Sequence, residues 1–365
     1  MFPSPFEEES KLPNWICEVK EILPLEPGWR LIARQRLKEQ TRPEGSLGLL
    51  ESFIERLVAI QKKERPEIER KRILIFAADH GVSEEGVSLY PREVTKAMVR
   101  NFLNGGATIN ALARYIQAEV CILDVGVDAD FEADPRLLSA KARGGTRNMT
   151  REPAMSLEEL DRALNAGWDV VRKAKEEDVQ ILALGEMGIG NTTAASAVVA
   201  ALTEQDPESV TGRGTGLDEA GLLHKIEVIK RALQLHEGFL KDPLRVLQCV
   251  GGYEIAAMTG AVLAAARFQI PAVIDGWIVS AAALAASRLN ARVLDYLFFA
   301  HQSAERGHRL LLKMLEVEPI LNLSMRLGEA SGAALALSIL EAGIRIYNEV
   351  STFAEAGVAN RQSRE

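Results

Sequence analysis

The sequence predicts an α/β protein built on a mostly parallel, doubly wound sheet. Short apolar runs recur from about residue 46 onward, and each is followed by a turn of small residues and then by a helical stretch. These runs are continuous rather than alternating, which indicates strands in a sheet that is covered on both faces. The length of 365 residues leaves room for one large domain with an appendage, or for two domains.

An N-terminal segment precedes the expected strands. Residues 1–45 are predicted to form short helices broken by Pro24, Pro27 and Pro43, as an arm or cap. The expected strands follow in chain order at residues 73–78, 120–125, 180–184, 271–274 and 296–300. Helical stretches lie between them, and this alternation implies βαβ units. Residues 357–365 are predicted to form a polar tail.

Composition and charge restrict the possible functions. The 43 basic and 51 acidic residues give a net charge of −8, which argues against a nucleic-acid partner. The longest uncharged apolar runs, 255–266 and 276–287, are too short to span a membrane. The N-terminus lacks the basic and apolar regions of a signal peptide, so a cytoplasmic location is expected. Cys17, Cys121 and Cys249 are widely spaced, and reduced thiols are expected.

Polar residues stand at the carboxyl end of every expected strand. They are Asp79 and His80, Asp124 and Asp128, Glu186, Asp275, and residues 301–303. In doubly wound sheets, ligands bind in the crevice beyond the carboxyl ends of the strands. We therefore expect these side chains to face one binding site.

The strongest signal for anion binding is residues 185–193, Gly-Glu-Met-Gly-Ile-Gly-Asn-Thr-Thr, which precede an alanine-rich helix. Glycines before a helix leave backbone N–H groups free to bind an anion, and the helix dipole adds to the attraction. Gly188, Gly190, Asn191 and Thr192 are therefore predicted to bind phosphate. The segment has neither the Gly-Lys-Ser/Thr ending of a Walker A loop nor a clean GxGxxG pattern. The structural alternative is a tight turn in which Asn191 or Thr192 caps the helix.

A second glycine-rich segment, residues 211–216, reads Thr-Gly-Arg-Gly-Thr-Gly. Gly214 and Gly216 are predicted to line the same site, and Arg213 and Lys225 to supply the cations that the first loop lacks. A flexible surface loop is the alternative. Two glycine-rich loops without a metal-binding motif favour a substrate with one phosphate over Mg-ATP.

Residues 325–333, Met-Arg-Leu-Gly-Glu-Ala-Ser-Gly-Ala, contain a single carboxylate between apolar segments. Gly328 and Gly332 allow backbone to approach a ligand closely or to adopt positive φ. A carboxylate in an aliphatic pocket has the raised pKa that a general base needs near neutral pH, so Glu329 is the candidate base. The alternative is that Glu329 caps the helix that starts near Ala330.

Asp79 and His80 follow the first expected strand and raise the possibility of a metal site. The other four histidines show no HxH or HExxH spacing, so no metal is expected. Asp79 and His80 are instead predicted to line the pocket and to order its loop. Ser303 is predicted to face the same crevice.

Six motifs occur in the order and spacing of one known family. They are AADHGVSEEGVS at 77–88, GEMGIGNTT at 185–193, TGRGTG at 211–216, VGGYEIAAMTGA at 250–261, HQSAERGH at 301–308 and RLGEASGA at 326–333. From about residue 45 to 358, the chain resembles the nicotinate-nucleotide–dimethylbenzimidazole phosphoribosyltransferases of cobalamin nucleotide-loop assembly.

The resemblance implies a Rossmann-like sheet, a small helical domain formed by the chain termini, and a homodimer. On this chain, residues 1–45 would be the N-terminal part of the small domain and 46–330 the large α/β domain. Residues 331–365 would form the C-terminal helix that joins the small domain, followed by the polar tail.

The resemblance also implies transfer of phosphoribosyl from nicotinate mononucleotide to 5,6-dimethylbenzimidazole, giving α-ribazole 5′-phosphate and nicotinate. Glu329 stands at the position of the family's base. Glu186 is predicted to orient the acceptor or to act as a secondary base, with loop structure as its alternative role. Met187, Ser88 and Leu327 are predicted to form the slot for the flat ring. Nicotinate leaves as a neutral ring nitrogen, so neither a metal nor another cofactor is expected.

The chain departs from the family pattern at a few positions. They are Gln302, Arg306, Ser324, Ala330 and Ser331. These departures bear on the preference for base or nucleotide, and the sequence leaves the acceptor open.

Two other functions remain open from the residues alone. One is a metal-dependent phosphohydrolase that uses Asp79 and His80. The other is a nucleotide-binding sensor in which Glu329 is only a helix cap.

Overall fold

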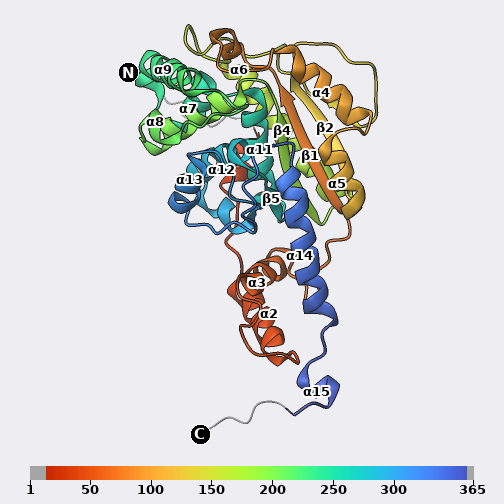
Figure 1. Cartoon of the computed structure of the whole chain (residues 1–365). Coiled ribbons are helices and arrows are strands. Elements are labelled where there is room, and N and C mark those ends of the chain that lie inside the picture. Colours follow the sequence, from red (N-terminus) through yellow and green to blue (C-terminus); the bar gives the residue numbers. More distant parts are fainter. Residues whose placement is uncertain (1–13, 360–365) are drawn as a thin grey trace.

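The computed structural model describes residues 14–359 and confirms the predicted α/β architecture (Figure 1). Residues 1–13 of the predicted arm and 360–365 of the predicted tail lie outside the described residues. A six-stranded sheet forms the centre, and all of its strand pairs are parallel. Helices cover both faces of this sheet, as the continuous apolar strands indicated.

The strands in chain order are β1 (Lys71–Ala78), β2 (Glu119–Gly126), β3 (Leu137–Ser139), β4 (Ile181–Met187), β5 (Ala272–Ile274) and β6 (Leu297–Phe299). Their order in the sheet is β3-β2-β1-β4-β5-β6. The chain therefore leaves β1 first toward one edge and then returns to build the other edge. This reversal beside β1 creates a switch point, where a doubly wound sheet has room for a ligand.

All five expected strands are present, but the sequence analysis missed β3. This strand has three residues, and none of them is fully buried. Its short run carries no pattern that separates it from a loop. Pairing with β2 defines it, through the registers Ile122↔Leu137 and Asp124↔Ser139.

The helices are α1 (Asn14–Val19), α2 (Pro27–Glu39), α3 (Leu49–Gln61), α4 (Glu93–Leu103), α5 (Thr108–Ile116), α6 (Leu157–Glu176), α7 (Asn191–Thr203), α8 (Pro207–Val210), α9 (Glu219–His236), α10 (Pro243–Val250), α11 (Tyr253–Arg267), α12 (Trp277–Leu289), α13 (His308–Met314), α14 (Ser331–Glu349) and α15 (Phe353–Ala356). Short 3-10 helices occur at η2 (Gly81–Glu85), η3 (Glu237–Phe239) and η4 (Ala291–Tyr296). Helices α4, α5 and α14 contact the sheet from one side, and α11 and α12 contact it from the other.

Helix α11 shows why part of the chain is apolar on all sides. It packs between the sheet and α6, and α12 lies beside it. All of its residues except Arg267 are buried. A helix in the second layer of an α/β protein has no solvent face, so a polar stripe would leave buried groups without partners.

Helix α14 joins the sheet to the helices at the lower end of the molecule (Figure 1). Its contacts include β4 and β5 as well as α3, which packs on α2. Gly343 makes the approach to α3 possible, because a Cβ there would lie 2.9 Å from Leu50 Cδ1. The position of the start of α14 is therefore coupled to both parts of the fold.

No helix in residues 14–359 combines the length and the apolar character that crossing a bilayer requires.

Candidate active site

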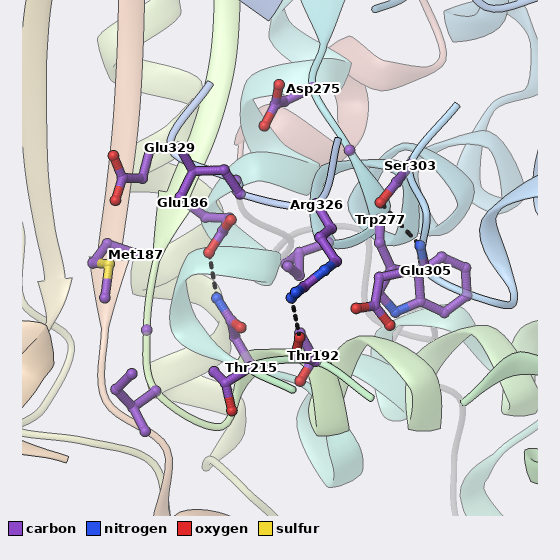
Figure 2. Close-up of a pocket in the computed structure, with 18 of the residues that line it drawn as sticks. Glu186, Met187, Thr192, Thr215, Asp275, Trp277, Ser303, Glu305, Arg326 and Glu329 are labelled. Atoms are coloured by element: carbon purple, nitrogen blue, oxygen red, sulfur yellow. Dashed lines mark hydrogen bonds between the residues drawn. The ribbon is translucent and has the colours of Figure 1, made fainter. Parts of the chain in front are cut away.

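The carboxyl ends of β4, β5 and β6 open into a cavity of about 540 Å³. The loops after η2, between α8 and α9, and before α14 complete its walls. Figure 2 shows Glu186 and Glu329 on one side of the cavity, and Trp277, Ser303 and Glu305 on the other. This is the edge at which doubly wound sheets bind ligands.

Most of the predicted site residues meet in this cavity. Those that line it are Ser88, Glu186, Met187, Gly188, Gly190, Asn191, Thr192, Gly214, Ser303, Leu327, Gly328 and Glu329. Predicted residues outside its lining are Asp79, Arg213, Gly216 and Lys225. Lining residues that the sequence analysis did not select include Tyr90, Trp277, Glu305 and Arg326.

The first glycine-rich loop turns directly from β4 into α7. Gly190 is the N-cap of α7 and has φ 95°, a conformation that favours glycine. At Gly188 a Cβ would lie 2.4 Å from the carbonyl oxygen of Ala78, so this position also excludes a side chain. Asn191 and Thr192 are the first helical residues, and neither is the cap. The capping alternative for them is therefore wrong, and the first turn of α7 faces the cavity.

Lys225 lies outside the cavity lining and contacts this loop through Thr192. Its side chain is fully buried, and its Nζ donates a hydrogen bond of 2.7 Å to Thr192 Oγ1. Burial lowers the pKa of Lys225 to about 8. Gly214 lies against both groups, since a Cβ there would be 2.8 Å from Thr192 Oγ1 and 3.1 Å from Lys225 Nζ. The two glycine-rich segments thus form one cradle, which Lys225 reaches through the Thr192 hydroxyl.

Arg213 does not contribute to the cradle. Its Nη1 donates to the carbonyl oxygen of Leu217 at 2.7 Å, and its Nη2 forms an ion pair with Glu219. Among the described lining residues, the one Lys or Arg side chain is Arg326, whose Nη1 donates to the Gly214 carbonyl at 3.3 Å. Arg326 lies three residues before Glu329 in the same motif, and this proximity was the signal that could have found it.

The backbone around Glu329 is strained. Gly328, Glu329 and Ala330 have consecutive φ values of 84°, 59° and 58°. Non-glycine residues adopt this left-handed region at a cost, and such strain is concentrated at functional sites. At Gly328 the φ of 84° favours glycine, and a Cβ there would lie 2.4 Å from Glu186 Oε1. Glu329 itself is 7% exposed, and burial raises the pKa of its carboxyl.

Asp275 caps the helix that follows Glu329. Its Oδ1 accepts a hydrogen bond of 2.8 Å from the backbone N–H of Ala333 in the first turn of α14. The N-cap residue of α14 is Ala330, so the alternative in which Glu329 caps this helix is wrong. Burial raises the pKa of Asp275 to about 7, although its backbone hydrogen bonds oppose the shift. The Glu329 carboxyl is thus left available to a ligand.

Glu186 lies at the centre of the acidic side of the cavity. Burial, and then the charges of nearby carboxylates, raise its pKa to about 8. Asn191 Nδ2 donates a hydrogen bond to its Oε2, so this amide contacts Glu186. Close carboxyl groups in a dry pocket cannot all ionise, and the cluster holds protons at neutral pH.

The mouth of the cavity is formed by two surface segments that touch. The backbone N–H of Leu89, next to Ser88, donates to Thr215 Oγ1 at 3.2 Å. Leu327 lies nearby in the third loop and is 52% exposed. Met187 lines the wall below, beside Glu186. These apolar and small groups form the border of the cavity at its mouth.

Ser303 is held on the opposite wall by a buried histidine. Its backbone N–H donates to His308 Nδ1 at 2.8 Å, and its Oγ accepts from the backbone N–H of Glu305 at 3.2 Å. Burial lowers the pKa of His308 to about 3, so the ring is neutral. Since Nδ1 accepts, Nε2 carries the proton and donates to Ser280 Oγ at 2.9 Å.

Asp79 and His80 lie behind the cradle. Asp79 Oδ2 accepts from the backbone N–H of Asp128 at 2.8 Å, and His80 Nε2 pairs with buried Glu254 at 2.8 Å. His80 also packs against the glycine loop, where a Cβ on Gly190 would be 3.3 Å from His80 Cβ. Within residues 14–359, no three His, Cys, Asp or Glu side chains are grouped as a metal site. The geometry therefore fits loop ordering and offers the phosphohydrolase alternative no ligand set.

The fold and the cavity are those of an α/β protein with a ligand site at the carboxyl edge of its sheet. A family model described as Phosphoribosyltransferase matches residues 22–358. The chain belongs to this family, and it is a pentosyltransferase.

Similar proteins agree with this assignment and with the resemblance seen in the motifs. A protein from Geotalea uraniireducens, named nicotinate-nucleotide–dimethylbenzimidazole phosphoribosyltransferase, is 50% identical over 93% of this chain and 96% of its own length. One of the same name from Chloroflexus aggregans is 46% identical over 94% and 98%. The crystal structure of CobT from Thermus thermophilus matches with a TM-score of 0.88 and 45% identity, covering 92% of this chain and 100% of that one.

Proposed function

We propose that this protein transfers the phosphoribosyl group of nicotinate mononucleotide to 5,6-dimethylbenzimidazole. The products are α-ribazole 5′-phosphate and nicotinate, and the reaction belongs to cobalamin biosynthesis. The names of the relatives support this assignment. The observation that carries it is one cavity that joins a glycine-rich cradle to a buried carboxyl, Glu329.

The donor suits such a cavity because nicotinate is bound to ribose as a pyridinium. When the bond from C1′ to the ring nitrogen breaks, the electron pair returns to that nitrogen and nicotinate leaves without a proton. No acid is required for this step. The enzyme has to position the reactants and stabilise the positive charge that develops on the ribose.

The acceptor requires a base. One benzimidazole nitrogen attacks C1′, and the N–H proton of the other nitrogen must then leave. Glu329 accepts that proton, because burial raises the pKa of its carboxyl toward the range in which a general base is effective. The same carboxylate stabilises the positive charge of the benzimidazole before the proton is transferred.

The acceptor attacks from the face of the ribose opposite to nicotinate, so the configuration at C1′ inverts from β to α. The phosphate binds at Gly188, Gly190 and Thr192, which line the cavity at the start of α7. This anchor leaves C1′ between the two rings.

The acceptor ring occupies the slot between Met187 and Leu327, with Ser88 at its edge. Glu186 lies beside this slot and orients the acceptor through a hydrogen bond. Ser303 lies on the opposite wall of the cavity (Figure 2), and in the proposed complex it faces the ribose. A protonated Glu186 donates such a bond without adding a charge, which fits its raised pKa.

A chromatographic assay tests this function. The purified protein is incubated with nicotinate mononucleotide and 5,6-dimethylbenzimidazole, and the release of nicotinate and of α-ribazole 5′-phosphate is followed. Wild type should form both products in equal amounts. Glu329→Gln should bind the nucleotide with unchanged affinity and form almost no product.

Each other outcome has a defined meaning. Equal turnover of the two proteins would remove Glu329 as the base and favour Glu186. Nucleotide binding without turnover in wild type would favour the sensor alternative. The same assay with substituted benzimidazoles, purines and phenols would define the preferred acceptor.

We further propose a homodimer in the cytoplasm, with residues 1–45 and 331–365 contributing to the small domain and 46–330 forming the large one. The resemblance to the family supports the dimer, and the packing of α14 on α3 supports the shared small domain. Sedimentation velocity tests the dimer, because a monomer mass at micromolar concentration would contradict it.

A further inference from the structure

One cation lines a cavity that is otherwise acidic. Among the described residues around the cavity, Arg326 is the one Lys or Arg side chain, whereas Glu186, Asp275, Glu305 and Glu329 all carry carboxyls. A phosphate monoester brings a further charge of about −1.5 to −2 at neutral pH. A cation in the lining favours its binding, and Arg326 adds this cation to buried Lys225, which reaches the cradle through the Thr192 hydroxyl.

Arg326 lies at the rim of the phosphate cradle. Its Nη1 donates to the carbonyl oxygen of Gly214 at 3.3 Å. Gly214 in turn borders the Thr192 hydroxyl and the ammonium of Lys225. Figure 2 shows Arg326 directed across the cavity toward the loops that carry Thr192 and Thr215. A phosphate in the cradle is therefore within reach of the guanidinium.

Most N–H donors of the Arg326 guanidinium form no hydrogen bond with the described residues. Arg326 is exposed, and no carboxylate of the described residues forms an ion pair with it. Its one hydrogen bond, to Gly214, is long. A guanidinium carries five N–H donors in a planar fork that matches two phosphate oxygens, so phosphate is a better partner than one carbonyl.

Arg326 and Glu329 belong to one short segment that crosses the cavity. The carbonyl of Met325 accepts a hydrogen bond of 2.9 Å from the backbone N–H of Ala304, before Arg326. After Glu329, the first turn of α14 is held by Asp275. Between these anchors the backbone is left-handed from residue 328 to 330. Arg326 is thus separated from Glu329 by two residues of a segment that is anchored at both ends.

We propose that Arg326 binds the 5′-phosphate of the donor and thereby positions Glu329 for proton abstraction. This inference rests on the proposed function and adds a link between the two ends of the cavity. When phosphate replaces the Gly214 carbonyl as the partner of the guanidinium, residues 326–328 are drawn to the cradle. Glu329 is then held in the orientation that faces the acceptor.

In this arrangement the phosphate contributes to catalysis as well as to binding. Binding energy from a part of the substrate that does not react is used to organise the reacting groups, so loss of that part lowers kcat as well as affinity. A donor that lacks the phosphate, nicotinate riboside, should therefore react slowly even at saturation. Free phosphite, which occupies the phosphate position without being attached, should restore part of the rate.

The experiment compares wild type, Arg326→Met, Arg326→Lys and Arg213→Met. Arg213 is the matched control, because it is also an exposed loop arginine but pairs with Glu219 instead of facing the cavity. For each protein, kcat and KM are measured with nicotinate mononucleotide, and turnover of nicotinate riboside is measured with and without phosphite. Thermal unfolding verifies that each variant is folded.

Phosphite should stimulate riboside turnover of wild type and Arg213→Met by roughly tenfold or more, and should leave Arg326→Met unchanged. With the nucleotide, Arg326→Met should raise KM by roughly 10- to 100-fold, the range for loss of a hydrogen bond to a charged group. It should also lower kcat. Arg326→Lys should recover part of the binding but little of the stimulation, because an ammonium is a point charge without the fork.

Two results would overturn the inference. Normal phosphite stimulation in Arg326→Met would show that Glu329 is positioned without Arg326, whatever the effect on KM. Unchanged KM and kcat in that variant would remove Arg326 from the phosphate site altogether.

Calorimetric binding separates this inference from the proposed function. The affinity of wild type for nicotinate mononucleotide should exceed its affinity for nicotinate riboside, and Arg326→Met should remove most of that difference. If wild type bound the nucleotide in this way but failed to form products, the proposed acceptor would be wrong while the role of Arg326 in phosphate binding stood. If the difference persisted in Arg326→Met, the inference would fail even with an active enzyme.

Discussion

The two ends of the cavity have buried ionisable groups of opposite type, with carboxyls at one end and Lys225 behind the cradle at the other. At the acidic end, burial raises the pKa of Glu186 to about 8 and also raises that of Glu329. At the cradle end, burial lowers the pKa of Lys225 to about 8. Both shifts have one cause, because a dry interior disfavours any charged form. At neutral pH the carboxyl of Glu186 keeps its proton. Lys225 at the cradle end is still a cation at that pH, but its lowered pKa means that it loses its proton more readily than an exposed lysine does.

This difference matches the charges of the proposed donor. Nicotinate mononucleotide has an anionic phosphate at one end and a cationic pyridinium at the other. In the proposed complex, the cradle receives the anion, and the carboxyls of Glu186 and Glu329 lie near the position where positive charge develops on the ribose and the acceptor. The contrast between the ends therefore orients the donor, and changes at each end should have separable effects.

The largest effect is expected at the acidic end. Glu329→Gln should lower kcat by roughly 10²- to 10⁴-fold, the usual contribution of a general base, and should leave nucleotide affinity nearly unchanged. The wild-type rate should fall as pH is lowered through the pKa of Glu329, since only the ionised form accepts a proton. Because burial raises that pKa, the loss should begin above the ordinary carboxyl range. Steady-state rates across the acidic and neutral pH range measure both effects.

Glu318→Gln, at an exposed carboxyl, is the control for that variant. A wild-type rate that stayed constant down to the ordinary carboxyl pKa, about 4.3, would contradict the assignment of the base.

The next effect is expected at the cradle. Gly190→Ala should raise KM for nicotinate mononucleotide by roughly tenfold, with a smaller change in kcat. The reason is that alanine is strained at φ 95° and its Cβ would meet His80 at 3.3 Å. Gly238→Ala is the matched control, because Gly238 has nothing within 4 Å of an added Cβ. A normal KM in Gly190→Ala would mean that the loop is not the phosphate site.

A smaller effect is expected behind the cradle. Lys225→Met removes the donor to Thr192 Oγ1 and the buried positive charge, so KM for the nucleotide should rise by about 3- to 10-fold. In wild type, KM should also rise above about pH 8 as Lys225 loses its proton, and the variant should lack this dependence. Lys230→Met, on the exposed face of the same helix, should change neither property. Equal pH dependence in wild type and Lys225→Met would refute this role.

The smallest effect concerns stability at the acidic end. Glu186 keeps its proton to about pH 8 in the folded protein, but loses it near 4.5 when unfolded. Unfolding therefore releases a proton between these values, and the contribution of Glu186 to stability falls as pH rises from about 4.5 to 8. Glu186→Gln should raise the melting temperature by about 2–4 °C at the upper end of this range and have little effect at the lower end. A gain of equal size at both ends would argue against the raised pKa.

The sequence was sufficient where the signal is local. Five strands were recognisable because each is a continuous apolar run. The turn at Gly190 was recognisable because a strand, several glycines and an alanine-rich helix follow one another directly. Glu329 stood out as a carboxylate between apolar segments. The short strand β3 was not predicted because its three residues show no strand pattern in the sequence, and only their pairing with β2 defines them as a strand.

The partners of charged side chains were not recognisable in the same way. Arg213 lies inside a glycine-rich motif but pairs with Glu219, whereas Arg326 reaches Gly214 in the cradle across a sequence separation of 112 residues. The cap of α14 likewise comes from Asp275 at the end of β5 rather than from neighbouring Glu329.

The sequence by itself determined the strands, the glycines and the position of a lone carboxylate, because these depend on burial and backbone conformation over a few consecutive residues. Only the tertiary structure decided which cation faces the glycine-rich cradle and which carboxyl has no capping role and is left for the proposed base. A long flexible side chain has several partners within reach, and its choice among them depends on where the sheet brings distant loops together. For this protein, that choice separates Arg326 from Arg213 and Glu329 from Asp275.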